Sequence, residues 1–174
     1  MEEYIGQIKD ILLGQDFLTW LWYRSENHGG RFATDKGDLF EIHLIDKVSV
    51  QGGEGDTLET ATVSGPMSEL KEAKLGLATG KKVTKGLVRI EAEPDGWQCM
   101  LKAEDFALGA FKTPVIEPGG DDDEPDAAFL EKMFLIERGM RFIDAAYKEF
   151  LTHRLGSKWP GELSGIRNWL GITG

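Results

Sequence analysis

The sequence predicts an α+β protein in which helices flank a largely antiparallel sheet of about four strands. Apolar residues recur every three or four positions near both ends of the chain, which is typical of amphipathic helices. In the middle of the chain they alternate with polar residues, as in half-buried strands. Short Gly-, Pro- and Asp-containing turns join the strand-like runs, and no repeat of 20 to 50 residues is visible. The class is therefore α+β, with N-terminal helices, one inserted helix and a long C-terminal helix.

The 174 residues fit a single domain, 1–174, because this length and an apolar content of 41% provide a sizeable core. Two helices are expected first. Residues 4–13 carry apolar side chains at helical spacing, and Gly14 ends the run. Asp16 is a suitable N-cap for a second helix to about Ser25, and residues 27–30 form a helix stop and a turn.

The strands come next. Residues 40–50 alternate apolar and polar side chains, residues 51–56 form a Gly-rich loop, and residues 57–63 are the expected return strand. Ser68 can cap a short helix to Ala78. Residues 83–92 and 97–103 then form a hairpin, because Glu93-Pro94-Asp95-Gly96 has strong turn chemistry.

The C-terminal part is predicted to be helical. Apolar residues at three- and four-residue spacing predict a helix over 127–154, roughly 42 Å long at 1.5 Å per residue. Trp159-Pro160 ends this segment, and residues 162–170 form a terminal helix. An internal acidic loop, 115–126, precedes the long helix; six acids and no base lie between Glu117 and Asp126.

Composition excludes several classes of protein. The net charge of −10 rules out a uniformly basic, nucleic-acid-binding surface. Charge-free stretches are too short for a membrane span, and the acidic start does not resemble a secretory signal, so a cytoplasmic location without membrane contact is expected. The single Cys99 excludes an internal disulfide and is expected in the core.

No catalytic group, metal ligand set or cofactor motif is assigned. Gly76, Gly80 and Lys81 do not have the spacing of a phosphate loop, and residues 121–132 lack the glycine and glutamate of a calcium loop. Pro94-Asp95 follows Glu69-Leu70-Lys71, the reverse of the order common in metal-dependent nucleases, so this activity is only a second alternative.

Two groups of residues remain as candidate surfaces. The helix after Asp16 carries four aromatic residues in seven, and they point all round it. Trp20, Trp22 and Tyr23 are candidates for an interaction surface, although large aromatic residues are more often buried in the core. The second group, here called the basic band, contains six bases against two acids between Ser68 and Arg89. Its members are Lys71, Lys74, Lys81, Lys82, Lys85 and Arg89, and they form either a set of DNA phosphate contacts or a solubilising surface.

The order of these motifs resembles the C-terminal part of the recombination-associated (RdgC-like) family. The resemblance covers about 16–159 and rests on the helix 17–22, the β-stretch to Val50, the helix 68–78, the segment Gly80-Lys81-Lys82-Val83-Thr84-Lys85 and the hairpin with Trp97. It implies a nucleoid-associated protein that binds duplex DNA without sequence preference, restrains the bacterial recombinase and forms ring-shaped dimers. Some members are named as putative exonucleases. The resemblance makes Lys81, Lys82 and Lys85 the expected backbone-facing residues.

The leading hypothesis is therefore a non-enzymatic, DNA-associated protein that forms a homodimer and binds duplex DNA weakly, with a steep dependence on salt. The first alternative is a protein–protein interaction module without DNA binding. The second is the metal-dependent exonuclease-like protein.

Overall fold

The computed structural model describes residues 12–52, 59–64, 71–115 and 125–171. Most of the helix expected over 4–13 and most of the acidic loop 115–126 lie outside these ranges, as do the starts of the predicted return strand and of the helix at Ser68. The described helices are α1 (Gly14–Asn27), α2 (Lys71–Ala78), α3 (Pro125–Arg154) and α4 (Trp159–Trp169). The strands are β1 (Arg31–Ala33), β2 (Leu39–Gly52), β3 (Glu59–Ser64), β4 (Lys82–Ala92), β5 (Asp95–Lys102) and β6 (Leu108–Lys112).

The strands form one antiparallel sheet in the order β1-β2-β4-β5-β6, and β3 pairs with the second half of β2. The α+β class is confirmed, with more strands than the expected four. Sequence periodicity did not identify β1 and β6 because β1 has only three residues, and in β6 a glycine and the positive φ of Ala110 interrupt the alternation. Two to three residues are too few to show a period of two.

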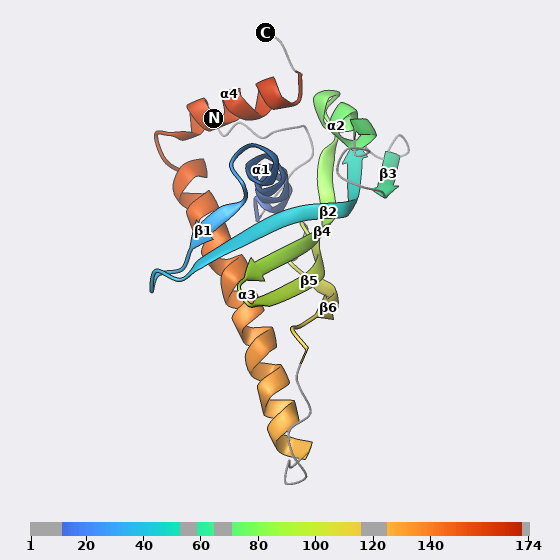
Figure 1. Cartoon of the computed structure of the whole chain (residues 1–174). Coiled ribbons are helices and arrows are strands. Elements are labelled where there is room, and N and C mark those ends of the chain that lie inside the picture. Colours follow the sequence, from blue (N-terminus) through green and yellow to red (C-terminus); the bar gives the residue numbers. More distant parts are fainter. Residues whose placement is uncertain (1–11, 53–58, 65–70, 116–124, 172–174) are drawn as a thin grey trace.

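The helices cover one face of the sheet, here called the inner face. Val88 and Ile90 of β4 and Trp97, Cys99 and Leu101 of β5 point into it and are buried. Helix α1 packs on β2 and β4, and α3 and α4 close over α1 from the other side, as Figure 1 shows with α1 seen end-on in the centre. The helix is therefore enclosed by the sheet and by two other helices.

This enclosure explains why α1 is apolar around its whole circumference. The Phe17 ring lies 5.5 Å from the Phe150 ring of α3, and the Trp22 ring lies 5.2 Å from Trp169 of α4, centroid to centroid. Gly14 is required at the start of the helix, because a Cβ there would come within 2.0 Å of the Ala103 carbonyl oxygen. A helix that is hydrophobic on all sides is stable in water only when it is covered on all sides.

Helix α3 differs from α1 in being covered over only part of its length. Its 30 residues span about 45 Å at 1.5 Å per residue. Leu135, Phe142, Ala146 and Phe150 bury one stripe against the body, whereas the described side chains from Asp126 to Phe134 are all exposed. The N-terminal turns extend beyond the sheet, at the bottom of Figure 1.

Candidate interaction surfaces

The structure divides the basic band, and Lys82 is the clearest correction to the sequence-based expectation. Its side chain is 1% exposed, and Nζ lies 3.6 Å from Oδ1 of the equally buried Asp16 on α1. Arg154 of α3 approaches the other carboxylate oxygen of Asp16, with Nε 3.4 Å from Oδ2. Lys82 thus joins the sheet to α1 and α3 inside the protein, and this position does not allow it to contact a DNA phosphate.

Three further members of the basic band lie near α2 rather than on a common face with the β4 cations. Lys74 makes an ion pair of 3.5 Å with Glu26 and lies over the Trp169 ring, so α2 and α4 already engage this cation. The aliphatic part of Lys81 packs beside Gly52 and Gly76. Lys71 is the first residue of α2, and its side chain lies outside what the structure describes.

The remaining two members, Lys85 and Arg89, lie on the outer face of the sheet, the face opposite the helices. They alternate along β4 with the inward-facing Gly86 and Val88. The β4–β5 register places Lys102 directly opposite Lys85, and Gln98 directly opposite Arg89. Lys112 of β6 lies opposite Gln98. Residues directly opposite each other in an antiparallel pair share a face, so four cations gather here, in a set called the outer-face patch: Lys85, Arg89, Lys102 and Lys112.

The surroundings of the outer-face patch are mixed in charge. Leu87 of β4 and Met100 of β5 form a half-buried pair. This pair lies between the Lys85–Lys102 pair and the Arg89–Gln98 pair. Arg89 Nε lies 2.9 Å from Oε1 of Glu91, its neighbour on the same face. In the part of the chain that the structure describes, neither Lys85 nor Lys102 makes an ion pair. The patch is thus most positive at the end of the sheet where these two lysines face each other.

The candidate interaction residues on α1 are in the core, which corrects the second sequence-based expectation. Trp20 and Trp22 are fully buried, and Tyr23 is 9% exposed. Burial raises the pKa of the Tyr23 hydroxyl, and the nearby Glu162 carboxylate acts in the same direction. These aromatic residues therefore bind α3 and α4 of their own chain and are not an exposed surface.

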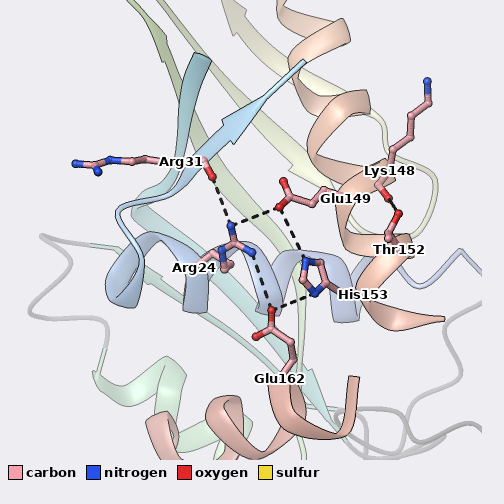
Figure 2. A network of polar contacts seen from close by, with 7 residues as sticks. All are labelled: Arg24, Arg31, Lys148, Glu149, Thr152, His153 and Glu162. Carbon is pink, nitrogen blue, oxygen red and sulfur yellow. Dashed lines mark hydrogen bonds and ion pairs between the residues drawn. The ribbon is translucent and has the colours of Figure 1, made fainter. Parts of the chain in front are cut away.

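A polar network that the sequence did not reveal joins α1, α3 and α4 (Figure 2). Arg24 of α1 lies 3.6 Å from Glu149 of α3 and 4.0 Å from Glu162 of α4. His153 lies between the same two carboxylates, at 3.9 and 3.5 Å. The Arg24 guanidinium also donates a hydrogen bond of 3.4 Å to the Arg31 carbonyl oxygen.

This arrangement has the residue types of an acid–base site, but each carboxylate faces charged groups of the protein itself. The Arg24 guanidinium carbon additionally lies 4.9 Å from the Trp20 ring centre, a cation–π contact. We interpret the network as a clamp that holds α4 on the rest of the fold. Its partners lie on three helices and are far apart in sequence, which is why no motif indicated it.

The largest exposed apolar area among the described residues lies on the first half of α3. The exposed fractions are 63% for Phe129, 65% for Leu130, 52% for Met133, 59% for Phe134 and 50% for Met140. Large side chains exposed singly are normal on protein surfaces, but a contiguous set indicates a binding surface. The sequence contained this signal in the spacing of the apolar residues, although periodicity alone did not show which part of the helix was covered.

An apolar groove lies beside this surface, between α3 and the β5–β6 end of the sheet. Its volume is about 190 Å³, and it is lined by Leu101, Phe106, Leu108, Met140, Ile143 and Tyr147, with Asp144 at its rim. The Tyr147 hydroxyl donates a hydrogen bond of 2.8 Å to the Leu12 carbonyl oxygen. Met140 belongs both to the groove and to the exposed area, so the two are continuous.

In the ranges that the structure describes, no group of three or more His, Cys, Asp or Glu side chains is arranged to hold a metal ion. Cys99 is buried, and burial raises the pKa of its thiol to about 11. None of the described helices is both long and apolar enough to cross a membrane.

Comparison of the chain with protein-family models and with curated protein sequences gave no match in either case.

Proposed function

We propose that the protein is a non-enzymatic, DNA-associated protein that contacts the phosphates of duplex DNA through the outer-face patch. The observation that supports this most directly is the position of Lys85 opposite Lys102. Like charges directly opposite each other destabilise an antiparallel pair of strands. An anion bound between the two lysines would therefore remove the electrostatic repulsion between them. The DNA backbone supplies such anions at regular spacing.

The geometry of the patch suits a backbone rather than a single phosphate. Lys85 and Arg89 are four residues apart on β4, a separation of about 13 Å at 3.3 Å per residue. Lys102 and Lys112 extend the patch across two neighbouring strands. Contacts to several phosphates and to no base edge would give binding without sequence preference.

The charge of the whole chain sets the expected strength of binding. At a net charge of −10, the body repels DNA at distances within the Debye length, so binding should be weak and confined to low salt. The resemblance to the RdgC-like family supports the proposal, and a location in the cytoplasm at the nucleoid is part of it. The predicted homodimer is part of this proposal, since two copies of the patch would bind one duplex more tightly than one copy.

The test is DNA binding by fluorescence anisotropy with a labelled duplex at 20 to 200 mM salt. We expect a slope of log K against log salt between about −2 and −4, as for two to four neutralised phosphates. Lys85→Gln with Lys102→Gln should weaken binding at least tenfold and make the slope shallower. The matched control is Lys36→Gln with Lys158→Gln, which removes the same charge at exposed positions outside the patch. Equal binding by both double variants would contradict the proposal.

A further inference from the structure

The chain enters α1 at the edge of the apolar groove between α3 and the β5–β6 end of the sheet. Leu12 is the first residue that the structure describes, and its carbonyl oxygen accepts the hydrogen bond of Tyr147, a residue that lines the groove. Gly14 lies against the backbone of Ala103, close to the lining residue Leu101. Because consecutive Cα atoms are about 3.8 Å apart, the residues directly before Leu12 begin at the groove.

The backbone on both sides of this point is held in an unusual conformation. Leu13 has a φ of 57° and Phe106 a φ of 56°, in the left-handed region that large side chains rarely adopt. Leu13 packs on the core, and the Phe106 ring lies 4.9 Å from the Tyr147 ring, centroid to centroid. Such conformations persist only where the surrounding contacts hold them. Tertiary contacts therefore fix the place at which the chain meets the groove.

The groove itself is apolar and open. Apart from Asp144 at the rim, its lining side chains are aliphatic or aromatic. Phe106, Leu108 and Tyr147 are only half-buried, and Met140 is 50% exposed. Removing this apolar surface from water is favourable, so the groove fits an apolar occupant.

The sequence directly before Leu12 has the pattern of such an occupant. Its apolar residues at helical spacing are Tyr4, Ile5, Ile8 and Ile11. On a helix with 3.6 residues per turn they fall within about 120° of the circumference, and the polar residues take the remainder. A helix of eight residues is too short to be stable alone in water, where roughly 12–15 residues are needed. This segment therefore becomes helical only against an apolar surface.

We propose that residues 4–11 form a helix that docks in the apolar groove through Tyr4, Ile8 and Ile11. The α3 side of the groove extends from Tyr147 back to Met140, so the docked segment runs beside α3 with Ile11 near Tyr147 and Tyr4 near Met140. The lengths agree, because residues 4–11 and Met140–Tyr147 each contain eight residues, about 12 Å at 1.5 Å per residue.

The connection at Leu12 favours this segment over a separate molecule. A short tether gives a segment an effective concentration on the order of millimolar at a neighbouring site, which a second protein would have to exceed. The rim charge does not oppose docking, because Asp144 already makes an ion pair of 3.0 Å with Lys148. This inference concerns a surface other than the outer-face patch and does not depend on DNA binding.

The first test is the oxidation of Met140 by dilute hydrogen peroxide in the full chain, followed by mass spectrometry of its peptides. Ile8→Glu places a charge on the docking face and should speed Met140 oxidation roughly threefold or more, because the undocked segment no longer covers the thioether. The matched control Gln7→Glu adds the same charge off this face and should keep the wild-type rate. Met133, which is 52% exposed and lies outside the groove, is the internal reference.

Two results of this experiment would overturn the proposal. One is an equal rate of Met140 oxidation, relative to Met133, in the wild type and in Ile8→Glu. The other is an equal increase in Ile8→Glu and Gln7→Glu, because a docked apolar face distinguishes these two positions.

Cysteine crosslinking tests the direction of the segment in a Cys99→Ala background. Tyr4→Cys with Met140→Cys should form an intramolecular disulfide on mild oxidation, seen as a shifted monomer band on a non-reducing gel. The control pairs Tyr4→Cys with Leu155→Cys, at a 67% exposed side chain beyond the other end of the groove. Equal crosslinking of the two pairs, or none in the Met140 pair, would contradict the docked arrangement.

Discussion

The indole nitrogen of Trp97 on β5 donates a hydrogen bond of 2.8 Å to the backbone carbonyl oxygen of Leu135 on α3. Both residues are buried, and Leu135 is the first buried residue among those that the structure describes on α3. Arg138, one turn later, lies over the Trp97 ring and makes an ion pair of 2.8 Å with Asp95. This contact is therefore the point at which α3 changes from a projecting helix to a packed one.

Replacement of Trp97 by Phe should lower the free energy of unfolding by about 1–3 kcal/mol, from the lost hydrogen bond and the smaller ring. The ring contact with Phe142 would largely remain, since the two centroids are 5.3 Å apart in the native protein. Urea denaturation followed by circular dichroism measures the change. An unaltered midpoint would show that the indole hydrogen bond does not contribute to anchoring α3.

Replacement of Asp16 by Asn should be more damaging, because Lys82 and Arg154 would lose a buried carboxylate that lies within 4 Å of both. Breaking a buried ion pair from one side costs about 3–5 kcal/mol. The control is Asp144→Asn, which removes an exposed carboxylate at 3.0 Å from Lys148 and should leave the urea midpoint nearly unchanged. Similar midpoints for the two variants would contradict the importance of the buried cluster.

The thiol of Cys99 should make stability depend on pH above 9. Burial raises its pKa from 9.0 to about 11, so the folded state holds the proton more tightly than the unfolded state does. The stabilisation is fully present below pH 9 and is lost as the pH rises through 11, by at most about 2–3 kcal/mol at 1.36 kcal/mol per pKa unit. Unfolding at pH 8 and pH 10.5 should show a smaller loss for Cys99→Ala than for the wild type.

Removal of the Arg24 charge should loosen α4. Arg24→Met keeps the aliphatic stem but leaves Glu149 and Glu162 facing each other across His153, and we expect a loss of about 1–3 kcal/mol. Hydrogen exchange measured by mass spectrometry should show faster exchange in peptides from α4 than in peptides from β4. The control is Arg31→Met, an exposed side chain whose backbone carbonyl still accepts the Arg24 hydrogen bond.

Local patterns predicted most of the elements. The hairpin around Glu93–Gly96 and the helix over 127–154 are present as β4–β5 and α3, with ends that differ by at most two residues. The hairpin register, however, is tighter than the four-residue turn implied, because Ala92 pairs directly with Asp95. This shift brings Lys102 opposite Lys85, a relationship that the sequence reading did not contain.

The candidate sites were harder to predict because they depend on contacts between distant parts of the chain. Lys82 looks like any surface lysine in sequence, and the carboxylate that accounts for its burial, Asp16, lies 66 positions earlier in the chain. Helical spacing indicated that Trp20 and Trp22 need cover, but not that α3 and α4 would supply it. The same spacing in α3 did not show that its first half remains exposed.

The enclosure of α1 has a consequence for biosynthesis. Its aromatic side chains leave the ribosome more than a hundred residues before α4, which covers them in the finished protein. Until α4 has been synthesised, Trp22 and its neighbours lack the cover that this helix provides, so α1 cannot be fully enclosed before then and its aromatic side chains are open to capture by chaperones.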